Sequence, residues 1–85
     1  MIIKVWVTKY ALSNGIELIE ADHDADKYPR MVTEISNTGY RRNFHVEGRD
    51  WHRTEESANK RAEKMRVNKI ASLQKQIDKL KTLSF

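Results

Sequence analysis

Two imidazoles and a carboxylate lie close together along the chain: His45, Glu47 and His52. Their spacing, H-x-E-x4-H, would allow a strand and the loop after it to bring the three side chains together. Such a set could hold Zn²⁺, or act as a general acid and base with His52 oriented by Asp50. No H-E-x-x-H pattern, nucleophile elbow or phosphate-binding loop accompanies it. We therefore predict no metal centre, no catalytic activity and no cofactor.

The segment GRDWHRTEES, residues 48–57, concentrates further side chains suited to recognition. Trp51 flanked by Arg49 and Arg53 is the combination expected of a nucleic-acid contact or of a hot spot in a protein interface. The alternative is structural, with Trp51 as a core or lid aromatic that folds over the first turn of a following helix and packs near Ala58, as a looser relative of the hydrophobic staple. Sequence alone leaves both interpretations open.

An acidic run precedes these residues, with Asp22, Asp24 and Asp26 in the segment DHDAD. The spacing imitates the start of an EF-hand loop, but the sixth position is Lys27 instead of Gly and the twelfth is Thr33 instead of a bidentate Glu. A calcium site is therefore not expected. The run is interpreted as an acidic strand end facing solvent, with mimicry of phosphate charge toward a basic partner as the alternative.

Basic residues are in excess only at the C-terminal end. The chain has sixteen Lys and Arg against twelve Asp and Glu, and residues 55–85 account for the whole excess of +4. Lysine on a helix face usually serves solubility, but neutralisation of phosphates also gives affinity for nucleic acid. A nucleic-acid-binding module is therefore the alternative function. Its contacts would be Lys60, Arg61, Lys64, Arg66 and Lys69, with Arg41 and Arg42.

The first 48 residues have the alternation of β-strands. Residues 2–10 place Ile3, Val5 and Val7 on one face, which predicts a strand. The segment LSNG, residues 12–15, has the Asn-Gly chemistry of a tight reversal, so residues 16–24 should pair back on the first strand.

Two more strands are expected after Pro29, over residues 31–36 and 40–48. Their connection would run through Asn37, Thr38 and Gly39. The sequence thus predicts a small four-stranded antiparallel sheet or half-open barrel over residues 1–48. A connecting loop over residues 49–54 would follow.

One long amphipathic helix is predicted over residues 55–84. Thr54 suits the N-cap, Glu55 and Glu56 suit the first turn, and no Gly or Pro follows. Apolar side chains recur close to the 3.6-residue period. They are Ala58, Ala62, Met65, Ile70, Leu73, Ile77 and Leu80.

The helix should extend beyond its sheet, because about 29 helical residues span roughly 43 Å whereas a strand of about seven residues spans roughly 23 Å. Its second half contains a short a/d heptad: Ile70, Leu73, Ile77 and Leu80. Ile at a and Leu at d favour two-stranded coils, and an exposed apolar strip usually marks an interface. These residues are predicted to mediate self-association or partner binding. The alternative is a kink near Val67 and Asn68 that returns the tail to the sheet.

Length and composition limit the function classes. Residues 1–85 are enough for one domain with one core. The sequence contains no cysteine, which excludes a disulfide framework and a thiolate zinc site. The opening MIIKVWVTKY is interrupted by Lys4 and has no long apolar run, so we expect no signal peptide, no membrane span and a cytoplasmic location.

Two segments carry a family resemblance: WVTKYALSNGI near the start and EGRDWHRTEESANKRAEKMRVNKIASLQKQIDKLKTLSF at the end. The pattern KYAL...GI, followed by W-x-R-T-x-E-x-A and a Lys-rich helix, resembles a group of small proteins of bacteriophages and mobile elements. The resemblance leaves out residues 20–42 and brings no catalytic motif. It implies a protein of the host bacterium's cytoplasm that binds and blocks host machinery, CRISPR effector complexes included.

These observations together predict an α+β fold and a non-enzymatic binding protein, a phage or mobile-element accessory factor or inhibitor such as an anti-CRISPR protein. Its partner would be a host protein or nucleoprotein complex, with a homodimer through the a/d heptad and nucleic acid as further partners. No membrane and no small-molecule substrate are expected. The predicted partner contacts are Arg41, Arg42, Arg49, Trp51 and Arg53.

Overall fold

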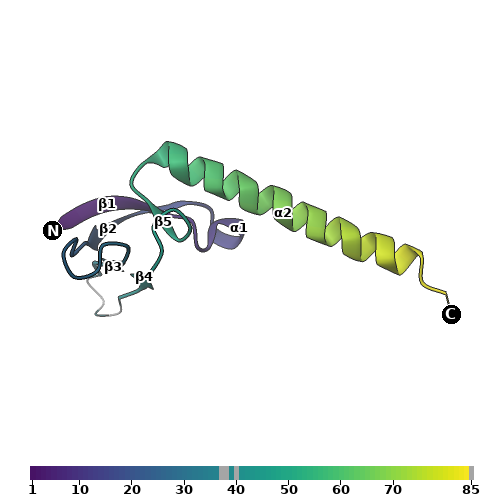
Figure 1. Cartoon of the computed structure of the whole chain (residues 1–85), viewed down its shortest axis with the longest axis horizontal. Helices are drawn as coiled ribbons and strands as arrows, with labels where there is room; N and C mark the ends of the chain where they lie inside the picture. Colours follow the sequence, from purple (N-terminus) through teal and green to yellow (C-terminus); the bar gives the residue numbers. More distant parts are fainter. Residues whose placement is uncertain (37–38, 40, 85) are drawn as a thin grey trace.

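The computed structural model describes residues 1–36, 39 and 41–84. Its elements are, in chain order, β1 (Ile2–Val7), α1 (Ala11–Asn14), β2 (Glu17–Asp22), β3 (Val32–Glu34), β4 (Asn43–Phe44), β5 (Trp51–His52) and α2 (Glu55–Lys81) (Figure 1). Within the described residues, the strands form one five-stranded antiparallel sheet in the order β4-β3-β2-β1-β5. The α+β prediction is confirmed, although the sheet is open and has one strand more than predicted.

The alternating apolar residues of β1 contribute to the core, as predicted. Val5 and Val7 are buried and Ile3 packs against them, and all three share a face with Ile19 and Ala21 of the paired strand β2. Three side chains from later strands complete the core on this face: Val32, Phe44 and Trp51. The core is therefore built by β-strands that are far apart in the sequence.

The tight Asn-Gly reversal between the first two strands was a wrong prediction. β1 ends at Val7, and the amides of Thr8 and Lys9 both donate to the carbonyl of Asp50. Residues 11–14 then form the short helix α1, and among the described residues only glycines take a positive φ, which is 74° at Gly15. A primed hairpin turn needs a positive φ at the asparagine as well.

The fourth predicted strand, residues 40–48, is reduced to the two residues of β4. A turn over residues 46–51 follows, in which the amide of Asp50 donates to the carbonyl of Val46 and Gly48 has a φ of 87°. The predicted loop 49–54 contains β5, which pairs with the end of β1. Of the predicted connection 37–39, Asn37 and Thr38 lie outside the described residues, as does Tyr40 at the start of the predicted strand.

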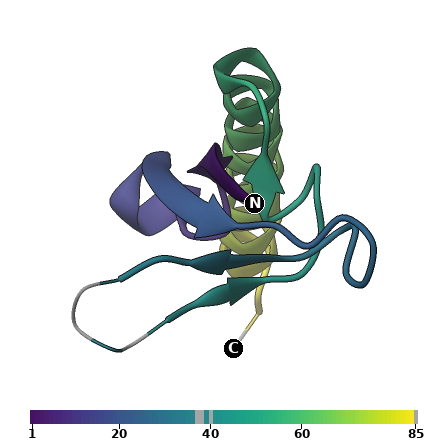
Figure 2. The same cartoon turned by 90° about the vertical axis from the view of Figure 1, so that its left-hand side faces the viewer.

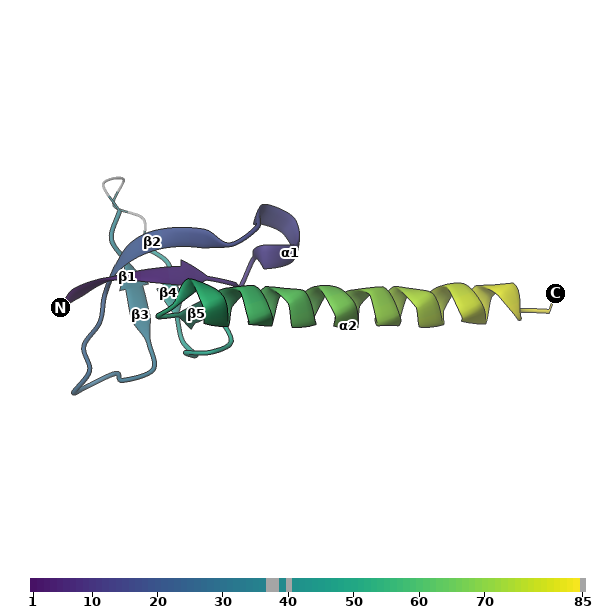
Figure 3. The ribbon, with the colours of Figure 1, turned by 90° about the horizontal axis from the view of Figure 1, so that it is seen from above.

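Helix α2 begins as predicted. The Thr54 hydroxyl caps it by accepting from the amide of Ser57 at 3.2 Å, and Glu55 and Glu56 lie in its first turn. Figure 2 shows these first turns above the strands, and α1 lies beside α2 in Figure 3. The helix ends at Lys81, three residues before the predicted boundary.

The far half of α2 extends away from the sheet without a break (Figure 1), and the long axis of the molecule is 58 Å. Residues 66–84, here called the arm, are all exposed. The alternative of a kink near Val67 and Asn68 is therefore wrong, since these residues continue the helix. No helix in the described part of the chain has the length and apolar character needed to cross a membrane.

Candidate functional site

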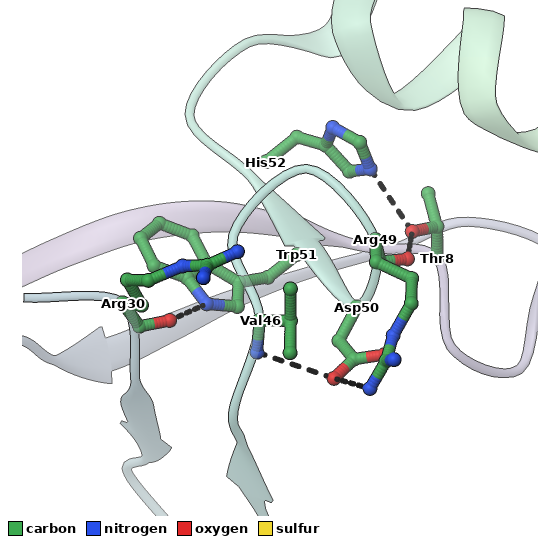
Figure 4. A network of polar contacts seen from close by, with 7 residues as sticks. All are labelled: Thr8, Arg30, Val46, Arg49, Asp50, Trp51 and His52. Carbon is green, nitrogen blue, oxygen red and sulfur yellow. Dashed lines mark hydrogen bonds and ion pairs between the residues drawn. The ribbon is translucent and has the colours of Figure 1, made fainter.

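Trp51 is a core residue. It is fully buried, and its ring lies edge-on to the His23 ring, with the ring centroids 5.7 Å apart. Its Nε1–H donates to the carbonyl of Arg30 at 2.8 Å (Figure 4). It shares a face with Val7 because the two residues are register partners. The prediction of Trp51 as a partner-contacting surface is wrong, and the structural alternative of a core aromatic is confirmed.

Arg49 and Arg53 remain partly exposed, with 61% and 47% of their side chains accessible. Arg49 pairs with Asp50 at 3.2 Å, while Asp50 also accepts from the amide of Val46 (Figure 4). Arg53 pairs with Glu47 at 2.9 Å, and its guanidinium lies 5.3 Å from the centre of the Trp51 ring. Both arginines thus help to hold the 46–51 turn, and their role in partner binding stays a prediction.

Arg42 is a structural cross-link. Its guanidinium donates to Glu34 at 2.6 Å and to Glu17 at 2.9 Å, and it lies over the rings of Tyr10 and Phe44. These hydrogen bonds raise the pKa of Arg42, and the bond from Arg42 lowers the pKa of the Glu34 carboxyl. Arg42 therefore joins β2 and β3 and is not a free contact, which corrects its predicted role. Arg41 beside it is exposed.

His52 connects the sheet to α2. The Thr8 hydroxyl donates to the carbonyl of Arg49 at 2.7 Å, so the 3.0 Å contact between Thr8 Oγ1 and His52 Nε2 requires Nε2 to carry the proton (Figure 4). Nδ1 of the neutral ring then accepts from Ser57 Oγ at 2.7 Å. The bonds join the residue after β1 to β5 and to the first turn of α2. Thr8 and Ser57 had no distinguishing pattern in the sequence.

Protonation of His52 is unfavourable in the folded protein. Burial lowers the pKa of His52, Arg61 acts in the same direction and Glu47 opposes them. The unfolded state, with a pKa near 6.5, therefore binds the proton more readily. Stability from His52 is complete above about pH 6.5 and is lost as the pH falls through the lower folded pKa.

We expect the free energy of unfolding, measured in urea, to be lower at about pH 5 than at about pH 7.5, and the drop to be smaller in the His52→Gln variant. His45→Gln is the matched control, because His45 is exposed, and this variant should keep the full drop. If His52→Gln lost as much stability on acidification as the parent, another group would be responsible.

The three residues with metal-ligand spacing, His45, Glu47 and His52, do not come together as a site. His45 is exposed, Glu47 is paired with Arg53, and both ring nitrogens of His52 are engaged. Across residues 1–36, 39 and 41–84, no group of three or more His, Cys, Asp or Glu is placed to hold a metal ion. The hollow beside His52 and Ser57 measures about 210 Å³, which is below the roughly 300–1,000 Å³ of small-molecule pockets.

The acidic run is exposed, as predicted for a strand end facing solvent. Asp22 pairs with the N-terminal ammonium at 3.0 Å, and Asp24 accepts from the amide of Lys27 at 3.1 Å. These contacts hold the loop after β2 in place. They do not bring the three aspartates together as ligands of one ion.

The arm carries an uncovered apolar strip, here called the seam, which consists of Ile70, Leu73, Ile77 and Leu80. Between 44% and 68% of each of these residues is accessible. An apolar strip of this kind on a projecting helix usually marks an interaction surface. The predicted oligomerisation residues are thus exposed together on one element.

The predicted nucleic-acid set divides into three groups. Lys60 pairs with Glu56 and Arg66 with Glu63, and Arg61 is half-buried. Of the five α2 residues in this set, only Lys64 and Lys69 are exposed without an ion pair to another described residue. Outside α2, Arg41 is exposed, whereas Arg42 is held by Glu17 and Glu34. At 3.6 residues per turn, Lys64 falls on the side of α2 opposite the seam, together with Lys75 and Lys79. We call these three residues the basic ridge.

The chain matches no protein family model, no curated protein and no solved structure. Function is therefore inferred from the geometry of the chain itself. The arm, with its seam and with Lys75 and Lys79 of the basic ridge, is the best candidate for the functional surface, because both faces are exposed and neither is needed to hold the sheet together.

Proposed function

We propose that the protein is a non-enzymatic binding protein that docks on a protein or nucleoprotein machine of a bacterial host and blocks it, as an accessory factor or inhibitor of a phage or mobile element. The single observation that supports this proposal is the arm, since residues 66–84 are all exposed on a helix that extends beyond the domain. A segment that is already helical loses less conformational entropy when it binds than an unstructured one does.

The charge of the arm indicates the chemistry of the target. Between residues 66 and 84 the arm has five basic side chains and a single carboxylate, Asp78. The basic side chains are Arg66, Lys69, Lys75, Lys79 and Lys81. An acidic protein surface, or the exposed nucleic acid of a nucleoprotein, complements such an arm. CRISPR effector complexes are a class of this kind, and the resemblance to phage proteins is the reason to consider them first. Arg41, Arg49 and Arg53 would add peripheral contacts.

Nucleic acid alone is the second candidate target, favoured by the free charges of Lys64 and Lys69. Phosphate contacts are sequence-independent and weaken steeply with salt. A helix can contribute such contacts without an aromatic platform, and Trp51 does not provide one because it is buried.

Capture from a bacterial lysate on the immobilised full-length protein separates these candidates. We expect one protein complex to be enriched over a column carrying an unrelated protein of similar charge, and to be retained after nuclease treatment. Retention that disappears with nuclease would favour the nucleic-acid candidate. No enrichment over the control column at low salt would reject the proposed function.

A further inference from the structure

The seam is an unpartnered helix face with a defined chemistry. From residue 70 to residue 80 its a and d positions are occupied only by Ile and Leu, while every charged residue of this stretch lies elsewhere on the helix. Ile at a and Leu at d is the combination that favours parallel two-stranded coiled coils. We infer that a second copy of this chain covers the seam, so that the protein self-associates as a parallel dimer through the arm.

The positions that flank the seam permit this pairing. In a parallel coiled coil the g side chain of one helix faces the following e side chain of the other. Lys69 would face Gln74 of the second copy, and Gln76 would face Lys81 of the second copy. Each cation therefore meets a neutral amide, which avoids the like-charge contacts that oppose helix pairing.

The fold leaves room for the second copy. The side of α2 that packs on the rest of the domain carries the buried Ala58 and the half-buried Ala62 and Met65. At 3.6 residues per turn the seam lies about a quarter turn from that side. It also begins five residues beyond Met65, where α2 has left the sheet (Figure 3). Two parallel arms can therefore meet with their domains on opposite flanks.

The pairing should be weak and should depend on salt in an unusual direction. Four seam side chains per helix make an interface smaller than the roughly 1,200 Å² of stable complexes, so we expect a dissociation constant above about 1 µM. Each arm carries five cations and one carboxylate, so two arms repel each other. Added salt screens this repulsion and strengthens the dimer, whereas an acidic partner would be bound less tightly.

Sedimentation of the full-length protein tests the inference. Between about 10 µM and about 1 mM protein, the mass should rise from 10.0 kDa toward twice that value. The rise should begin at a lower concentration in about 500 mM than in about 50 mM NaCl. The Leu73→Lys plus Ile77→Lys variant should stay monomeric, and the matched control on the opposite side, Lys75→Gln plus Lys79→Gln, should associate at least as well as the parent. A monomer at every concentration in both salts would overturn the inference.

The orientation can be tested because the chain has no cysteine. Ser84 follows the end of α2 by three residues, so two parallel arms place their Ser84 residues at the same end of the dimer. Two copies of the Ser84→Cys variant should therefore form a disulfide-linked dimer on mild oxidation if the arms are parallel. The link should be lost when Leu73→Lys and Ile77→Lys are added. A dimer that sediments but does not cross-link would be antiparallel, which contradicts the inference. Since neither measurement involves the lysate, failure of the dimer and failure of the proposed function are distinguishable.

Discussion

Replacement of Trp51 by Ala is expected to lower the free energy of unfolding by about 3–5 kcal/mol, the range for loss of a large buried aromatic side chain. Trp51 has no accessible surface and packs with the core residues of β1, β2, β3 and β4. A chain of this size has a total stability of roughly 4–13 kcal/mol, so the loss is a large fraction of that stability and the variant should unfold at a much lower urea concentration than the parent. Urea unfolding followed by far-UV circular dichroism measures the change.

Two further variants separate packing from surface contact. Trp51→Phe keeps an aromatic ring in the core but loses the Nε1–H bond to Arg30, so it should be destabilised less than Trp51→Ala. Arg53→Ala removes the partly exposed guanidinium above the ring and should change stability little. A Trp51→Ala protein that unfolds at the parent's urea concentration but no longer captures a partner would mean that Trp51 is a contact residue after all.

The largest effect on binding is expected from reversal of charge on the arm. Lys75→Glu plus Lys79→Glu changes two residues of the basic ridge and should reduce capture of the partner at least about tenfold, equivalent to 1.4 kcal/mol or more. Both side chains are exposed and lie outside the domain core, so stability should not change. Titration of immobilised protein with the captured complex, at constant salt, gives the affinity ratio.

Lys75→Arg plus Lys79→Arg is the matched control, since it preserves the charge, and it should bind like the parent. The seam variant Leu73→Lys plus Ile77→Lys provides a second comparison, because it adds positive charge while preventing self-association. If the charge-reversed protein captured the partner as well as the parent, the basic ridge would not be part of the contact.

Local patterns in the sequence were sufficient for the elements that depend on neighbouring residues. The alternation of Ile3, Val5 and Val7 identified the buried face of β1, and Thr54 with two following glutamates identified the start of α2. Each of these features rests on a period or a cap within a few residues. The end of α2 differed by three residues, because nothing in the sequence after Lys81 stops a helix.

Pairings between distant residues could not be read from these patterns. β5 has only two residues, too few to show an alternation, and its existence depends on β1 more than forty residues earlier. The burial of Trp51 and the engagement of His52 both follow from that pairing. Arg42 likewise looks like a free cation until the strands bring Glu17 and Glu34 to it.

The arm shows a different limit of sequence interpretation. The apolar period of residues 70–80 is the same whether the helix folds back on its own sheet or extends outward, so the sequence left both arrangements open. The structure resolves this choice, because α2 is continuous to Lys81 and the sheet completes its core with Val32, Phe44 and Trp51 instead. An apolar strip that the fold does not use is available for a partner.

Hydrogen–deuterium exchange on the free protein and on its captured complex tests the central claim most directly. In the free protein, below the concentration at which it self-associates, amides of the arm should exchange faster than those of β1 and β2. Residues 66–84 are all exposed and lie outside the core, so no packing opposes local opening of this part of the helix. On capture, we predict strong protection of residues 66–84 and little change in the strands. Protection confined to the 46–51 turn, with an arm that still exchanges rapidly, would contradict the account.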